Sequence, residues 1–125
     1  MSVLVDTSVI IDYLRGHHGA EEVLEKQRLG APLHASEITR LEVLAGMRAN
    51  EQDGTQSFLS TFVWHSVDTL IAERAGELGR KWLPSHASID SADLAIAATA
   101  MVAECKLLTC NVEHFPMFAD LRKPY

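Results

Sequence analysis

The chain begins with a short apolar run that ends on a carboxylate and leads at once into residues that can start a helix. Val3, Leu4 and Val5 show no polar alternation, which is typical of a strand buried on both faces of a parallel sheet. Asp6 stands at the carboxyl end of this strand, the edge where ligands bind in open α/β sheets. A carboxylate there suits a cation or a proton transfer, although it could serve only as a helix cap, a task that Thr7 or Ser8 can also perform.

The same alternation of apolar strands and helical segments continues along the 125 residues. We expect strands at 2–6, 32–35, 63–67 and 107–109, a polar turn at 50–54, and helices at 7–15, 19–29, 36–49, 55–62, 68–83 and 91–104. The helix at 91–104 is apolar on nearly all sides, which indicates a buried helix. This order predicts one α/β domain over residues 1–125, with a mostly parallel central sheet covered by helices on both faces.

Charge and composition limit the function. The net charge of −6 argues against a protein that binds nucleic acid through a broad basic surface. Carboxylates that cluster around divalent cations would still allow a metal-bridged phosphate substrate. No apolar run approaches the roughly 20 residues that span a bilayer, and no signal peptide is visible. Cys105 and Cys110 lack partners at zinc spacing and indicate free thiols, as in a cytoplasmic protein.

Several acids stand in places where solvation alone does not explain them. Glu42 lies beside an apolar helical stripe at positions 38, 41, 44 and 45, where it must pair, be neutral or bind something, unless it is exposed near a base. Asp90 and Asp93 stand three residues apart at the start of the buried helix. One of them can cap that helix, but two like charges in one turn repel each other unless a cation separates them.

Polar oxygens also follow the last predicted strand. Thr109 and Asn111 could orient a metal-bound water or a carboxylate ligand, or could simply belong to a turn. A ligand set made only of oxygen favours Mg²⁺ or Mn²⁺. The chain carries no glycine-rich phosphate loop, dinucleotide fingerprint or serine nucleophile elbow, so these three chemistries lack their usual markers.

Four segments, in order along the chain, resemble the motif set of PIN-domain ribonucleases and, more narrowly, of the VapC toxins of bacterial toxin–antitoxin modules. They are Val5-Asp6-Thr7-Ser8, Thr39-x-x-Glu42-Val43-Leu44-Ala45-Gly46, Asp93-Leu94-Ala95-Ile96-Ala97-Ala98-Thr99-Ala100 and Leu107-Leu108-Thr109-Cys110-Asn111-x-x-His114-Phe115. The resemblance implies a three-layer α/β/α PIN-like domain that cleaves RNA endonucleolytically with Mg²⁺, for which Mn²⁺ can substitute. It also implies a homodimer and a cognate VapB-like antitoxin as inhibitor.

The resemblance carries over residue by residue. Asp6, Glu42 and Asp93 match the first three acidic positions and would hold the metal, with a metal-bound water as nucleophile. The supporting roles fall to Asp90 as a further ligand or a group behind the ligands, to Thr7 and Ser8 as positioners of Asp6, and to Thr109 and Asn111 as residues that orient waters.

The chain departs from many relatives near the last strand. Asn111 and His114 occupy places where those relatives carry a fourth acid. We therefore expect one firm metal site, with a second ion bound only in the RNA complex as the alternative. Two rival functions stay open: a nuclease that acts on DNA or on a maturation intermediate, and a catalytically weak binding module. The basic residues available to contact phosphate are Arg15, Arg40, Arg48, Arg74, Arg80 and Lys81.

Overall fold

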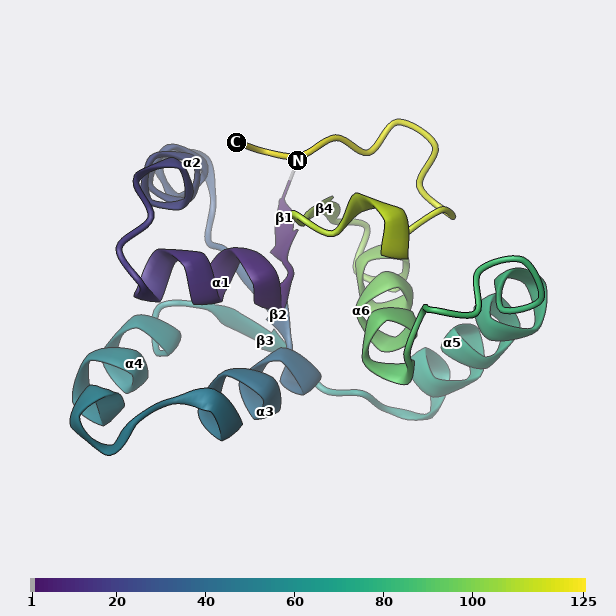
Figure 1. The fold of residues 1–125 in the computed structure, drawn as a ribbon, viewed down its shortest axis with the longest axis horizontal. Helices are drawn as coiled ribbons and strands as arrows, with labels where there is room; N and C mark the ends of the chain where they lie inside the picture. Colours follow the sequence, from purple (N-terminus) through teal and green to yellow (C-terminus); the bar gives the residue numbers. More distant parts are fainter. Residues whose placement is uncertain (1) are drawn as a thin grey trace.

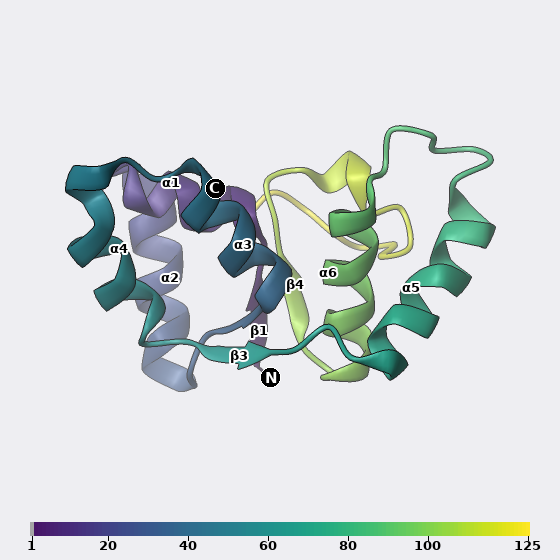
Figure 2. The same cartoon turned by 90° about the horizontal axis from the view of Figure 1, so that it is seen from below.

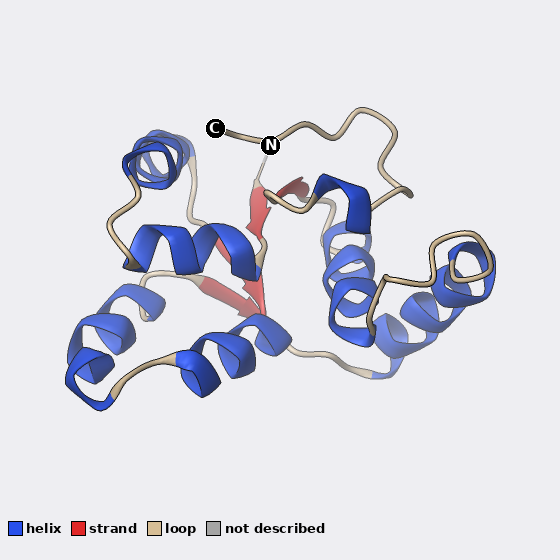
Figure 3. Ribbon diagram, in the orientation of Figure 1, coloured by secondary structure: helices blue, strands red, loops and turns tan. Residues whose placement is uncertain are grey.

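A four-stranded parallel sheet forms the centre of the protein, in a computed structural model that describes residues 2–125. The strands are β1 (Val3–Val5), β2 (His34–Ser36), β3 (Val63–His65) and β4 (Lys106–Leu108). They lie in the order β3-β2-β1-β4, so the first strand of the chain is central and pairs with the last. Figure 3 shows these short strands surrounded by much more helix. The prediction of a parallel sheet between helices is confirmed.

Helices cover both faces of the sheet. They are α1 (Thr7–Leu14), α2 (His18–Gly30), α3 (Glu37–Gly46), α4 (Gln52–Leu59), α5 (Thr69–Trp82) and α6 (Ser91–Val102), with 3-10 turns η1 (Ala49–Glu51) and η2 (Val112–His114). Figure 1 shows α1, α2 and α4 on one side of the sheet and α5 and α6 on the other. Figure 2 shows α6 between the sheet and α5. Within residues 2–125, no helix has both the length and the apolar character to cross a membrane.

The alternation of side chains along β1 creates two separate cores. Val3 and Val5 belong to the core under α1, α2 and α4, whereas Leu4 belongs to the core under α5 and α6. Successive residues of a strand point to opposite faces, so a strand that is buried on both sides needs apolar residues at every position. This explains the continuous apolar run that opens the chain. The helix α6 is buried from Asp93 to Ala100, as its apolar sequence predicts.

The rotation of α3 differs from the sequence prediction. The buried residues of α3 are Thr39 and Val43, while Leu41 is 60% exposed, so the stripe at 38, 41, 44 and 45 is not the core face. The Thr39 hydroxyl lies 3.0 Å from the Thr7 hydroxyl, and this polar contact brings the 39/43 face toward α1. Glu42 is consequently half-buried on the inner side of the helix.

Several boundaries also differ. The helix predicted to reach residue 49 ends at Gly46, and the predicted turn at 50–54 is wrong because η1 and α4 occupy that segment. A carboxylate oxygen of Glu51 accepts a hydrogen bond from the Arg48 N–H at 2.7 Å, which starts the helical segment before Gln52. Polar composition alone suggested a turn there, but the same polar residues cap a helix.

Candidate active site

Asp6 is a buried carboxylate held by hydroxyl groups from two elements. It is 3% exposed at the end of β1. Its Oδ2 accepts hydrogen bonds from the Ser8 hydroxyl at 2.9 Å and from the Thr109 hydroxyl at 2.7 Å. Asp6 occupies the N-cap position of α1 but makes no capping hydrogen bond with its side chain. Both hydrogen bonds use Oδ2, so Oδ1 is left for another partner.

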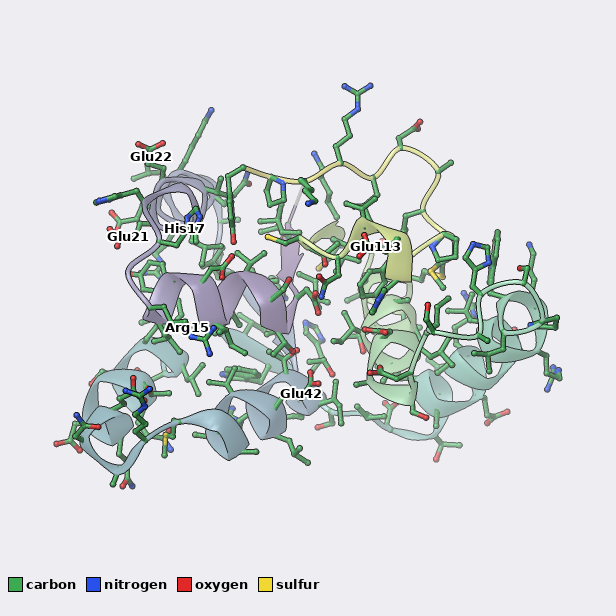
Figure 4. The ribbon with its side chains drawn as sticks, in the orientation of Figure 1. Arg15, His17, Glu21, Glu22, Glu42 and Glu113 are labelled. Carbon is green, nitrogen blue, oxygen red and sulfur yellow. The ribbon has the colours of Figure 1, made fainter. Side chains whose placement is uncertain are left out.

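The hydroxyls of Thr7 and Ser8 do not cap α1, contrary to the sequence expectation. Ser8 donates to Asp6, and its oxygen accepts a hydrogen bond from the Cys110 N–H at 3.2 Å. Thr7 reaches α3 instead: its hydroxyl donates to Oε1 of Glu42 at 2.6 Å. Ser8 therefore contacts Asp6, whereas Thr7 contacts a different acid. Figure 4 shows Glu42 near the centre of the molecule, in the region that α1, α3 and α6 approach.

Asp90 and Asp93 form a reciprocal cap at the start of α6. The backbone N–H of Asp93 donates to Oδ1 of Asp90 at 2.8 Å, and the N–H of Asp90 donates to Oδ2 of Asp93 at 3.2 Å. Two acids in one turn are therefore accounted for by helix capping, which is the simpler of the two sequence interpretations. The two residues differ in burial, however, because Asp90 is exposed and Asp93 is 9% exposed.

Burial makes the Asp93 carboxyl hard to ionise. It raises the pKa of Asp93 from 3.8 to about 6, and the charge of Asp90 adds to the rise, while the Asp90 N–H and His114 act in the opposite direction. A carboxylate that is costly to charge at neutral pH is one that a cation would stabilise. This electrostatic feature separates Asp93 from an ordinary capping residue.

His114 contacts one of the predicted site acids, although the sequence pattern marked its position only by the absence of an acid. Its Nδ1 lies 3.1 Å from Oδ2 of Asp93. It ends η2, and the next residue, Phe115, is fully buried and fixes the segment against the α6 core. Glu113, which Figure 4 labels on the same turn, is exposed. The signal in the sequence was the position of His114 three residues after Asn111, where many relatives carry an acid.

The acids approach from separate elements without meeting at one point. Among residues 2–125, no three His, Cys, Asp or Glu side chains lie close enough together to hold a metal ion. The ion pairs found in this part of the chain also give Asp6, Glu42 and Asp90 no basic partner. Among the described residues, Asp6 therefore has hydroxyl donors and no Lys, Arg or His nitrogen within 4.0 Å of its carboxylate. This oxygen-rich, cation-poor donor set fits a hard divalent ion such as Mg²⁺ or Mn²⁺.

The remaining predicted residues lie around these acids in different ways. The backbone N–H of Asn111 donates to the Thr109 hydroxyl at 3.0 Å, which closes the turn after β4. Among the basic residues, Arg40 pairs with Glu37 and lies over the Trp64 ring at 4.0 Å from its centroid, and Arg74 pairs with Glu77. Arg15 lines a hollow between α1, α3 and α4, and the ion pairs found within residues 2–125 do not include it.

Comparison with known proteins gives concordant results at the level of sequence and fold. Residues 3–121 match the family model described as PIN domain. The chain is 46% identical over 123 residues to ribonuclease VapC19 of Mycobacterium tuberculosis, and the alignment covers 98% of both chains. It is 39% identical to ribonuclease VapC10 of the same organism, with 98% of this chain and 92% of the relative covered. A solved structure titled as a toxin–antitoxin complex from Klebsiella pneumoniae superposes with a TM-score of 0.83 at 31% identity, covering 99% of this chain and 98% of the other.

Proposed function

Because this chain belongs to the PIN-domain family, we propose that it is the toxin of a type II toxin–antitoxin pair and acts as a metal-dependent endoribonuclease. The relatives named ribonuclease align with it over nearly their full length, which supports an RNA-cleaving activity. The observation that carries the proposal is the buried Asp6, which lies at the carboxyl edge of a parallel sheet with hydroxyl donors but no basic partner.

We propose that acids from three elements, the end of β1, helix α3 and helix α6, bind the cation. Asp6, Glu42 and Asp93 are the proposed ligands, and Asp90 is either a further ligand or a group that supports Asp93. Mg²⁺ is the proposed ion, with Mn²⁺ as substitute. When bound, the ion supplies a Lewis acid that lowers the pKa of a coordinated water and offsets charge on the scissile phosphate.

The other residues hold the ligands in place. The hydroxyls of Ser8 and Thr109 orient Asp6, and that of Thr7 orients Glu42, at the distances given above. Such fixed donors keep a carboxylate in one orientation, so less reorganisation accompanies each binding event. Asn111 is proposed to orient waters beside Thr109. We propose one firm metal site, and a second ion that binds only in the RNA complex is the alternative.

The proposed protein partner is one that could neutralise the acids of the site. A solved complex of toxin and antitoxin shares this fold, and this supports a cognate VapB-like antitoxin as the inhibitor. An Arg or Lys of the antitoxin would pair with the acids and replace the charge of the ion. We also propose a homodimer, and the cytoplasm as the compartment that holds the RNA substrate.

Cleavage of RNA by purified, antitoxin-free protein tests the proposal. Wild type with Mg²⁺ should cleave total RNA at discrete sites, and Asp6→Asn or Asp93→Asn should lower the rate at least about 100-fold, because each removes a charge that holds the ion. Asp53→Asn is the matched control, since Asp53 is exposed on α4. Mapping the cleavage sites by primer extension would identify the RNA target.

Three results would contradict the proposal. The enzyme function is wrong if wild type cleaves no RNA, and the metal dependence is wrong if cleavage survives chelation by EDTA. Cleavage of DNA in preference to RNA would instead favour the rival nuclease. In cells, growth arrest on induction should disappear with Asp6→Asn and should be reversed by co-expression of the antitoxin gene.

A further inference from the structure

A single segment after β4 contacts two acids that come from opposite parts of the fold. Thr109 donates to Asp6, which ends β1, and His114 contacts Asp93, which lies on α6. The segment is fixed at both ends, because Thr109 is fully buried and Phe115 is fully buried in the α6 core. Its conformation therefore influences how these two carboxylates are placed relative to each other.

The two oxygens of the Asp93 carboxylate have different surroundings. Oδ2 accepts the hydrogen bond from the Asp90 N–H and lies against Nδ1 of His114. Among the described residues 2–125, the hydrogen bonds of this carboxylate use Oδ2, so Oδ1 is the oxygen that is free for a cation. A carboxylate held on one oxygen by two donors has little freedom to rotate.

The orientation of the imidazole decides what His114 can do. The two nitrogens of an imidazole point to different sides of the ring. Since Nδ1 of His114 is directed at Asp93, Nε2 is directed away from that carboxylate. His114 is therefore poorly placed to bind, through Nε2, the same ion as Asp93. It is well placed to donate its Nδ1–H to Asp93.

We propose that His114 is a positioning residue that holds Oδ2 of Asp93 and thereby presents Oδ1 to the divalent cation. This inference rests on the proposed function, because it takes Asp93 as a ligand of the ion. A fourth carboxylate at this place would add a charge and would leave Oδ2 with the Asp90 N–H but without the imidazole donor. An imidazole with its proton on Nδ1 orients the ligand by hydrogen bonding, as groups behind metal ligands commonly do.

Binding of Mn²⁺ to the metal-free full chain, followed by calorimetry and by electron paramagnetic resonance, tests the role of His114 without relying on activity. His114→Ala should raise the Kd for Mn²⁺ at least about 10-fold, the lower end of the 10–100-fold range typical of such supporting groups. His114→Asn, whose amide N–H stands in place of Nδ1–H, should stay within about 2-fold of wild type. His18→Ala is the matched control, because His18 is an exposed histidine on α2.

A double-mutant cycle separates positioning from a general effect on the fold. If His114 acts through Asp93, then His114→Ala should have no further effect on Mn²⁺ affinity in an Asp93→Asn background. If His114→Ala does not fold, His114→Phe replaces it, since Phe keeps a ring but lacks the donor. His114→Phe should then weaken binding while His114→Asn does not.

The outcomes distinguish this proposal from the one it rests on. Unchanged Mn²⁺ affinity in His114→Ala or in folded His114→Phe overturns the positioning role, as does an equal loss in the Asp93→Asn background. In those cases wild type still binds Mn²⁺ and cleaves RNA, so the proposed function stands. If wild type binds no Mn²⁺, the metal site itself is wrong, and the positioning role is overturned with it.

Discussion

At the scale of single residues, Asp93 shows how a proposed metal ligand can weaken the fold that carries it. Asp93 is 9% exposed and lies one helical turn from Asp90, and both conditions raise the pKa of its carboxyl, to about 6. Above that pH the folded protein holds a charge that it solvates poorly. A bound cation would relieve this penalty, so stability and cation binding depend on the same group.

Replacing Asp93 by Asn should therefore stabilise the metal-free protein at neutral pH. The folded-state pKa of about 6 lies above the unfolded value of 3.8, so this carboxyl stabilises the fold below about pH 4, and the contribution is lost as the pH rises through 6. Two pKa units correspond to at most about 3 kcal/mol. Because the side chain is partly solvated, we expect Asp93→Asn to raise the free energy of unfolding by about 1–2 kcal/mol at pH 7.5.

Urea unfolding in EDTA at pH 7.5 and at pH 4 measures this effect. The difference between Asp93→Asn and wild type should shrink at the lower pH, and Asp53→Asn should show no comparable change. Adding Mn²⁺ should stabilise Asp93→Asn less than wild type, because the variant binds the ion more weakly. A lower stability of Asp93→Asn than of wild type at pH 7.5 in EDTA would contradict this account.

At the scale of elements, the site depends on the pairing of β1 with β4, the first and last strands of the chain. The Asp6 N–H donates to the Leu108 carbonyl at 2.9 Å, and the Thr109 hydroxyl donates to the Asp6 carboxylate. Backbone and side chain thus join the same two strand ends. A hydroxyl that donates to a buried carboxylate and accepts from the Asn111 N–H is difficult to replace.

Two buried threonines offer a matched test of that connection. Thr109 and Thr99 are both fully buried, but among residues 2–125 the hydrogen bond of the Thr99 hydroxyl goes to the Ala95 carbonyl within α6. Thr109→Val should lower the free energy of unfolding by about 1–3 kcal/mol, because it leaves a buried carboxylate and an N–H short of partners. Thr99→Val should cost less than about 1 kcal/mol, since that carbonyl can still accept from the helix backbone. Equal losses in urea unfolding for the two variants would contradict the special role of Thr109.

The elements also show which parts of the structure the sequence could predict. Continuous apolar runs were sufficient to predict strands β1 and β4, and the small apolar residues of 94–100 were sufficient to predict that helix α6 is buried. The rotation of α3 was not predictable from its apolar stripe, because the Thr7–Thr39 contact and the Thr7–Glu42 hydrogen bond join residues more than thirty positions apart. For the same reason spacing alone could not show that His114 reaches Asp93, whereas motif resemblance pointed to that position.

At the scale of the whole molecule, the C-terminal tail joins the two cores. Phe115 belongs to the core under α5 and α6, with Phe118 and Leu121 packed against it. Tyr125 packs instead against the core under α1, α2 and α4, where its hydroxyl donates to Oδ2 of Asp12 at 2.6 Å. The tail therefore crosses from one face of the sheet to the other, and it starts from the segment that carries the contacts to Asp6 and Asp93.

The contact of Tyr125 with Gly19 on α2 allows a test of how much the C-terminal tail contributes to the stability of the fold. A Cβ added at Gly19 would lie 2.9 Å from Cβ and Cγ of Tyr125, whereas a Cβ at Gly76 on α5 would meet nothing within 4 Å. Gly76→Ala should raise the free energy of unfolding by about 0.5–1 kcal/mol through helix propensity. Gly19→Ala should instead lower it by about 1–2 kcal/mol, because the ring must leave its place and Asp12 loses a hydrogen bond.

The assignment of that loss to the tail requires a second substitution. In a Tyr125→Gly background both Tyr125 atoms that crowd Gly19 are gone, and Cε1 of His17, 3.0 Å from the added Cβ, is the contact that remains. Gly19→Ala should then lose most of its penalty, whereas Gly76→Ala should be slightly stabilising in either background. Urea unfolding of wild type, the two single variants and the double variant gives the coupling free energy between positions 19 and 125. If the tail stabilises residues 109–114, hydrogen exchange should show that this segment opens faster in Gly19→Ala than in wild type. An unchanged penalty for Gly19→Ala without the Tyr125 ring would place the cost in α2 alone, and the tail would then have no part in supporting the segment beside the acids.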